Sequence, residues 1–179
     1  IRTATNPDYH WGNFVLFAQA PAPGDVDLWL DLFEQEIGAK QPTSHVALGW
    51  DGPEPGALQP FLDRGFSLDT AVVLTATTLQ PPPHPNSELE VRPLRSDLDW
   101  RQATENQIAC ADTEPYGIKA FRAFKLPQMA SYRAMSEADR GRWFGAFIGE
   151  RLVADLGIYL ADGVARYQSV GTHPDFRRR

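Results

Sequence analysis

The chain ends in its clearest alternation of apolar runs and turn residues. Three apolar runs, Trp143–Ile148, Arg151–Leu160 and Val164–Thr172, are separated by Gly149-Glu150 and by Ala161-Asp162-Gly163. Glycine and aspartate tolerate the positive φ angles that tight hairpin turns demand. Proline lacks the amide hydrogen that a ladder needs, so the third run should end near Pro174. The pattern predicts an antiparallel meander of three strands.

The residues before this meander predict one strand and two helices. Leu89–Leu94 alternates as a strand, and a capping pattern at Ser96 predicts a helix that runs through Cys110. A second helix is predicted over Ala120–Ala134, followed by a separate capped turn at Ser136–Asp139. The aromatic and basic side chains of the second helix fit either a face packed on the sheet or a binding rim.

The first part of the chain predicts a smaller β-α-β-α-β subdomain. Its strands are expected at Asn13–Phe17, His45–Trp50 and Thr70–Thr78, and its helices at Asp25–Ile37 and Glu54–Arg64. The first helix is amphipathic, because apolar residues recur at helical spacing and acidic residues occupy the opposite face. Gly38 follows it as a stop signal.

A proline-rich segment separates the two parts. Residues 80–87 are Gln-Pro-Pro-Pro-His-Pro-Asn-Ser, which is typical of a stiff polyproline-type spacer. We therefore predict a subdomain at 1–79, a linker at 80–87 and a domain at 88–179. The expected fold class is α/β (α+β), with a mixed, mostly antiparallel sheet flanked by helices.

Charge is distributed unevenly and narrows the classes of partner. The net charge is −6, but residues 1–86 hold 3 basic and 10 acidic residues, whereas residues 87–179 hold 14 and 13. An acidic first half argues against a nucleic-acid-binding protein, which needs a basic face. No apolar run approaches the ~20 residues that cross a membrane. The single cysteine, Cys110, fits a reducing cytoplasm, and the four scattered histidines predict no metal site.

The end of the predicted meander carries a motif. From Val170 to the last residue the chain is Val-Gly-Thr-His-Pro-Asp-Phe-Arg-Arg-Arg. This resembles the GNAT (GCN5-related N-acetyltransferase) family, in which a strand ending Val-x-x-Pro-x-Phe/Tyr precedes an Arg/Gln-x-x-Gly-x-Gly/Ala loop. Val170, Pro174, Phe176 and Arg177 match, although one extra residue separates Val170 from Pro174. GNAT domains also commonly begin with a strand like Glu-Val-Arg-Pro-Leu and a capped helix, as residues 90–99 do.

The resemblance covers residues 89–179, the N-terminal half of one GNAT domain, and it implies a function. It implies an N-acetyltransferase that moves an acetyl group from acetyl-CoA, a co-substrate, to a primary amine of a small molecule or peptide. The backbone of Val170, Gly171 and Thr172 would pair with the pantetheine arm. Arg177, Arg178 and Arg179 would begin the loop that holds the pyrophosphate. The two loop glycines would fall past Arg179, so we expect the chain to be truncated within the phosphate loop.

Acetyl transfer also needs a base for the amine and an acid for the leaving thiolate. A carboxylate and a tyrosine suit these roles, and four residues could face the cleft: Glu114, Asp155, Tyr159 and Tyr167. We assign the catalytic roles to Glu114 and Tyr167. His173 lies beside the expected phosphate loop, where we expect it to cap the turn rather than contact phosphate.

Residues 1–79 resemble the GNAT family more weakly. Phe61–Phe66 is similar to the helix end with a Gly-Phe pair that precedes a late strand of the family, but prolines at Pro21 and Pro23 remove amides where a phosphate loop would lie. This part is either a degenerate GNAT-like region or an unrelated small α/β module. Two other readings remain open for the chain: a catalytically inactive GNAT-like binding or assembly module, and a homodimer formed through open sheet edges.

Overall fold

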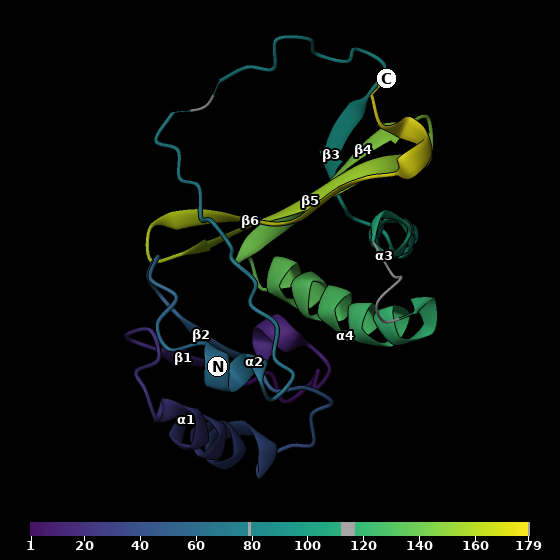
Figure 1. Cartoon of the computed structure of the whole chain (residues 1–179). Helices are drawn as coiled ribbons and strands as arrows, with labels where there is room; N and C mark the ends of the chain where they lie inside the picture. The colour runs from purple at the N-terminus through teal and green to yellow at the C-terminus, as the bar shows by residue number, and fades with distance from the viewer. Residues whose placement is uncertain (79, 112–116, 179) are drawn as a thin grey trace. The chain divides into compact units, whose positions relative to one another are not determined.

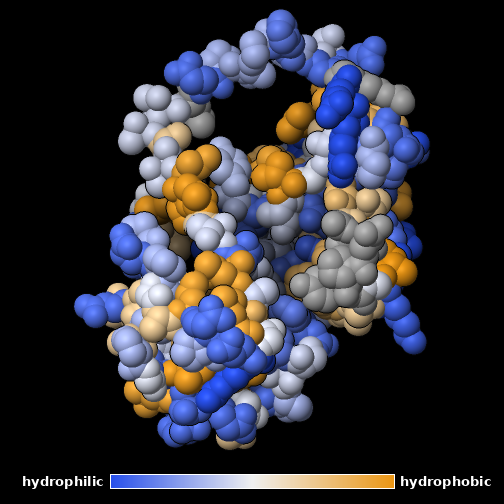
Figure 2. All heavy atoms as spheres, in the orientation of Figure 1, coloured by the Kyte–Doolittle hydropathy of each residue, from blue (hydrophilic) through white to orange (hydrophobic). Residues whose placement is uncertain are grey.

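The computed structural model describes residues 1–78, 80–111 and 117–178, and it divides into two compact units, Ile1–Gln80 and Pro81–Arg179 (Figure 1). The first unit holds a two-stranded sheet and the second a four-stranded sheet. Residues 80–88 are exposed, and they form the polar arc at the top of Figures 1 and 2. Among the helices of the described ranges, none is long and apolar enough to cross a bilayer.

The sheet of the second unit is antiparallel throughout, in the order β3-β4-β5-β6. Its strands are β3 (Glu90–Pro93), β4 (Gly141–Ile148), β5 (Arg151–Ala161) and β6 (Val164–Thr172). Gly149, Asp162 and Gly163 adopt positive φ angles in the two hairpins, as the turn residues predicted. The predicted meander and the helix-flanked antiparallel sheet are confirmed.

Two helices cover the same face of this sheet. They are α3 (Asp97–Cys110) and α4 (Ile118–Glu137). The ring of Trp143 in β4 lies 6.1 Å from that of Trp100 in α3 and 5.0 Å from that of Tyr132 in α4, measured between centroids. Around these rings lies one buried apolar cluster: Leu94, Trp100, Ala103, Met129, Trp143, Phe147, Leu152 and Tyr159. The core therefore lies between the helices and one face of the sheet.

The start of α3 has the capping box that the sequence predicts. The Ser96 hydroxyl accepts a hydrogen bond from the Asp99 amide, and the Asp99 carboxylate accepts one from the Ser96 amide. The end of α4 differs from the prediction, because the helix continues through Ser136 to Glu137 instead of breaking into a separate capped turn. The Ser136 hydroxyl donates a hydrogen bond to the Tyr132 carbonyl one turn earlier, so Ser136 is accommodated inside the helix and does not cap a new turn.

The first unit is built on a parallel pair of short strands, β1 (Val15–Phe17) and β2 (Leu48–Trp50). Between them runs α1 (Asp25–Phe33), which continues as the π-helical turn η2 (Glu34–Gly38). A single-turn η1 (His10–Gly12) precedes β1, and α2 (Gln59–Leu62) follows β2. The Trp29 ring of α1 stacks on Phe17 at 3.7 Å between centroids, which places the small core between helix and sheet.

Two predictions for this unit are wrong. The helix expected over Glu54–Arg64 spans only four residues, because Gly56 takes a left-handed φ and prolines interrupt the segment before it. Thr70–Thr78, all of which the structure describes, forms no strand. Side chains 72–74 are 78–88% exposed, so the segment has neither a ladder partner nor an apolar surface to cover. The unit is thus β-α-β-α within the described residues.

Candidate active site

The edge strand β6 is interrupted where the sequence places the candidate cofactor residues. Gly157 of β5 pairs with Gln168, but Asp155 pairs with Gly171, so Leu156 alone faces both Ser169 and Val170. Two residues opposite one is a β-bulge, and Ser169 adopts a left-handed φ of 46° within it. A bulge turns backbone N–H and C=O groups out of the regular ladder. In this stretch of the edge strand such groups can therefore form hydrogen bonds with partners outside the sheet.

A buried carboxylate lies beneath this bulge. Asp155 is 4% exposed, and its Oδ1 accepts hydrogen bonds from Asn106 Nδ2 at 2.6 Å and Gln107 Nε2 at 3.0 Å. Its Oδ2 accepts from Trp143 Nε1 at 2.7 Å. Three N–H donors from α3 and β4 thus surround one carboxylate of β5. Their number compensates much of the cost of removing the charge from water.

The same amides connect the carboxylate to the bulge. Gln107 Nε2 donates to the Ser169 carbonyl at 2.6 Å, and Asn106 Nδ2 lies 3.5 Å from the Gly171 carbonyl. An added Cβ at Gly171 would lie 3.1 Å from Gln107 Nε2, so a side chain at this position would press on that amide. Peptide units are planar and trans here, so the Val170 N–H points opposite to the Ser169 carbonyl, away from α3.

Burial shifts the ionisation of two groups in this network. Burial raises the pKa of Asp155 to about 6, while its three hydrogen-bond donors and the charge of Lys125 act to lower it. Lys125 of α4 is itself buried, and burial lowers its pKa to about 8, opposed by the charge of Asp155. Its ammonium donates to Gln128 Oε1 at 2.7 Å. Shifts of this kind often occur at functional sites.

The raised pKa of Asp155 predicts a pH-dependent stability. Its folded pKa exceeds the unfolded value of about 3.9, so the folded protein holds this proton more tightly between pH 4 and 6. Stability from this group is full below about pH 4 and is lost as pH rises through 6, by about 3 kcal/mol. Asp155→Asn should remove that part of the slope in urea unfolding between these pH values. The exposed turn variant Asp162→Asn is the control, and an unchanged slope in Asp155→Asn would contradict the assignment.

Cationic side chains gather just past the end of β6. The His173 amide bonds the Val153 carbonyl at 2.8 Å, and the chain then turns through η3 (Pro174–Phe176). Arg177 Nε donates to the Thr172 carbonyl at 3.0 Å, which holds this guanidinium against the strand end. The Arg151 guanidinium lies 4.6 Å from the centre of the Phe176 ring. His173 caps the turn, as expected, by accepting from the Asp175 amide.

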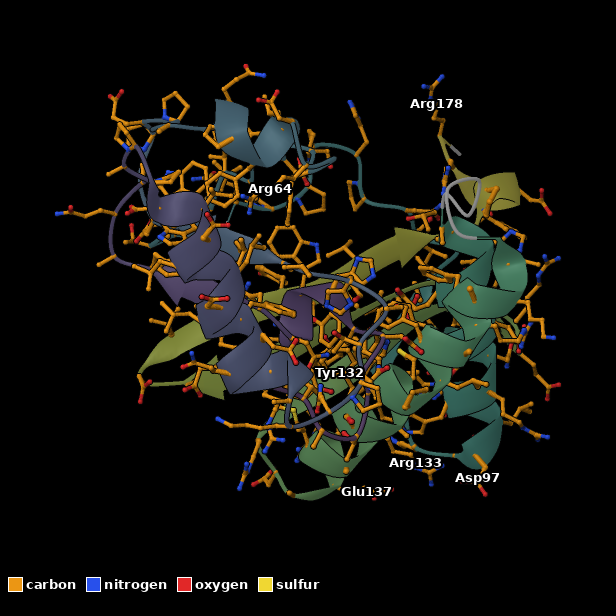
Figure 3. The ribbon with its side chains drawn as sticks, turned by 60° about the horizontal axis from the view of Figure 1, so that its bottom comes forward. Arg64, Asp97, Tyr132, Arg133, Glu137 and Arg178 are labelled. Carbon is orange, nitrogen blue, oxygen red and sulfur yellow. The ribbon has the colours of Figure 1, made fainter. Side chains whose placement is uncertain are left out.

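Figure 3 shows where this end of the unit lies relative to its ion pairs. Arg178, which has a left-handed φ, extends from the end of the chain. At the other end of the helices Arg133 bridges Asp97 and Glu137. The acidic partners of that cluster therefore lie away from the cationic turn. Arg179 lies outside the described residues.

The four residues expected at the cleft lie in different places. Tyr167 is 56% exposed on β6, on the opposite side of the strand from Gln168, whose Oε1 accepts from Tyr132 of α4. Asp155 and Tyr159 are buried, so the expectation that they could face an open cleft is wrong. The Tyr159 hydroxyl donates to the Tyr132 carbonyl at 2.8 Å within the core. Glu114 lies outside the described residues.

Sequence reasoning missed the partners of Asp155. Asn106 and Gln107 stand three and four residues after the fully buried Ala103, so helical spacing places both on the inner face of α3. Two amides on the buried face of a helix require polar partners, and this was the available signal. The burial of Lys125 could not be predicted in the same way, because nothing in the sequence distinguishes it from the other basic residues of α4.

Neither a protein-family model nor a curated protein sequence matches the chain. The solved structures that are similar to part of it include two acetyltransferases. PaiA N-acetyltransferase from Thermoplasma acidophilum, crystallised with coenzyme A, has a TM-score of 0.43 and 17% identity over 51% of this chain and 62% of that one. A "putative acetyltransferase" from Pyrococcus horikoshii has a TM-score of 0.39 and 16% identity over 59% of this chain and 33% of that one. The chain spans less than two thirds of either protein.

Proposed function

We propose that the second unit transfers an acetyl group from acetyl-CoA to a primary amine. The observation that carries this proposal is the bulge in the edge strand, followed directly by a turn with exposed arginines. An edge strand binds an extended ligand through its backbone. A cationic turn at the end of that strand suits a pyrophosphate.

The candidate residues would meet the pantetheine arm and then the pyrophosphate of acetyl-CoA in chain order. The backbone of Val170, Gly171 and Thr172 would pair with the amides of the pantetheine arm, and the Val170 side chain is exposed beside it. Arg177 and Arg178, with Arg179, would then meet the pyrophosphate. The thioester would lie on the bulge side of this stretch, where backbone N–H groups leave the regular ladder and can stabilise a developing oxyanion.

The chemistry requires proton transfers at two atoms. The neutral amine nitrogen attacks the thioester carbonyl carbon, and a base removes its proton as the C–N bond forms. The C–S bond then breaks, and the leaving sulfur receives a proton. We propose Glu114 as the base and Tyr167, which is exposed on β6, as the acid. Proximity of the two reactants supplies much of the remaining rate enhancement.

The proposal predicts that the arginines contribute to cofactor affinity. Calorimetric titration should show saturable binding of acetyl-CoA, and Arg177→Ala combined with Arg178→Ala should weaken it about tenfold, because charge-assisted hydrogen bonds to phosphate are lost. Arg166→Ala is the control, since Arg166 is exposed near the opposite end of the same strand. Equal affinities in the double variant and the parent would refute the assignment of the turn.

Turnover separates the two functions considered for this unit. Release of free thiol from acetyl-CoA should accelerate when primary amines are added. Acetyl-CoA binding without amine-dependent thiol release, across small amines and peptides, would contradict the enzyme and favour an inactive binding module.

A further inference from the structure

The arrangement around Asp155 is more elaborate than packing requires. The residues involved come from α3, β4 and β5, and they converge on a stretch of β6 that includes a non-glycine residue in a left-handed conformation. Buried ion pairs and charged networks can often be replaced by apolar residues without loss of stability. Unusual backbone conformations persist only when the surrounding structure enforces them. The network is therefore better explained by what it does to the bulge than by its contribution to the core.

The carboxylate determines which way the amides face. An amide side chain can turn by 180°, which exchanges its donor for its acceptor. The ionised carboxylate of Asp155 offers only acceptors, so it holds the nitrogen of Gln107 inward, where the same nitrogen also donates to the Ser169 carbonyl. Trp143 fixes the other carboxylate oxygen. Each member of the chain Trp143, Asp155, Gln107 thus orients the next.

The orientation passes through the peptide unit to the outer side of the strand. Once the Ser169 carbonyl is fixed toward α3, the Val170 N–H must point the other way. Lys125, Cys110 and Arg177 supply the other ionisable groups that act on this network, from α4, α3 and the turn after β6. The Ser169 carbonyl accepts its side-chain hydrogen bond from Gln107.

We infer that Gln107, held by Asp155, is a positioning residue that sets the conformation of the Ser169–Val170 bulge for acetyl transfer. The inference rests on the proposed function and deepens it, because it makes the rate of transfer depend on a side chain that touches neither substrate. Gln107 should influence the reaction step more than the affinity for acetyl-CoA, because the arginines assigned to the pyrophosphate and the pantetheine contacts assigned to Gly171 and Thr172 lie outside the Ser169–Val170 bulge.

The test compares two glutamines of the same helix. Gln107→Met removes the donor at similar length, and Gln107→Asn keeps an amide but shortens its reach. Gln102→Met is the matched control, because Gln102 also bridges α3 to the sheet, but by bonds to the Glu150 carbonyl and the Leu152 amide at the β4–β5 hairpin. We expect both Gln107 variants to lower kcat about tenfold while the Kd for acetyl-CoA stays within about twofold. Gln102→Met should leave both quantities unchanged.

A second readout does not depend on turnover. In the Gln107 variants the amide resonance of Val170 and the backbone coupling constant that reports φ of Ser169 should both change, whereas Gln102→Met should leave them in place. Unchanged resonances and unchanged kcat in a folded Gln107 variant would overturn the inference. Changed resonances with no amine-dependent turnover in the parent protein would uphold the control of the bulge and refute acetyl transfer instead.

Discussion

Replacing Trp143 with alanine should lower the free energy of unfolding of the second unit by about 4 kcal/mol. The ring is 1% exposed and lies against Trp100, Tyr132 and Tyr159, so alanine leaves a cavity at the centre of the core. Alanine also removes the indole N–H that Asp155 Oδ2 accepts, which leaves part of a buried carboxylate without a partner. Both effects act in the same direction.

Hydrogen exchange of the β5 amides is the appropriate measurement, because it reports on the second unit independently of the first. Trp143→Phe keeps most of the ring but lacks the N–H, so its smaller loss separates the hydrogen bond from the cavity. Trp11→Ala is a control in the first unit, where the ring is largely exposed. A loss below about 1 kcal/mol for Trp143→Ala would show that the core does not depend on this ring.

Replacing Asp99 with alanine should cost the second unit about 3 kcal/mol, because it removes the buried carboxylate of a partly buried ion pair together with the acceptor of two backbone amides. The Asp99 carboxylate accepts hydrogen bonds from both terminal nitrogens of Arg92, each at 2.9 Å. It also accepts hydrogen bonds from the backbone amides of Arg95 and Ser96. It therefore joins β3 to the first turn of α3. The Arg92 guanidinium holds the pKa of Asp99 well below its usual range.

The lowered pKa of Asp99 determines how the stabilisation by this carboxylate depends on pH. A depressed folded pKa means that the stabilisation is present above about pH 4 and is lost as pH falls below it. The cost of Asp99→Ala in urea unfolding should accordingly be full at pH 7 and shrink in acid. Asp97→Ala is the matched control, since its side chain is 80% exposed in the same helical turn and forms a surface ion pair with Arg133, and it should cost less than about 1 kcal/mol. Equal costs for the two variants would contradict this account.

The elements that the sequence predicts correctly are those that depend on neighbouring residues. The capping box at Ser96, the hairpins at Gly149 and Asp162, and the strands of the meander follow from local turn chemistry and from alternation. Thr70–Thr78 has strand propensity, but a strand also requires a partner, and no local pattern supplies one. Local rules therefore predicted the sheet of the second unit and failed for an isolated segment.

The candidate site was predictable only in part for the same reason. The motif at Val170–Arg177 is continuous in sequence, so the stretch of β6 could be singled out. The bulge could not, because it depends on Gln107, which lies 62 residues before Ser169. The sequence predicts that Asp155 could face the cleft, since nothing in the sequence around a carboxylate shows that it is buried. Its partners Asn106 and Trp143 lie 49 and 12 residues away, and only the fold brings them together.

The three hydrogen bonds to Asp155 also restrict how this chain can change during evolution. Because one carboxylate accepts hydrogen bonds from Asn106, Gln107 and Trp143, a descendant that loses the acid would leave the Trp143 indole without this acceptor and each of the two buried amides with one acceptor fewer. Loss of the acid alone should therefore lower the stability of the fold, and replacement of its partners together with it should lower that stability less. Related chains should therefore carry these four positions as a set, either all polar as here or replaced together. Relatives of this chain should therefore be recognisable from these four buried positions rather than from residues on the surface.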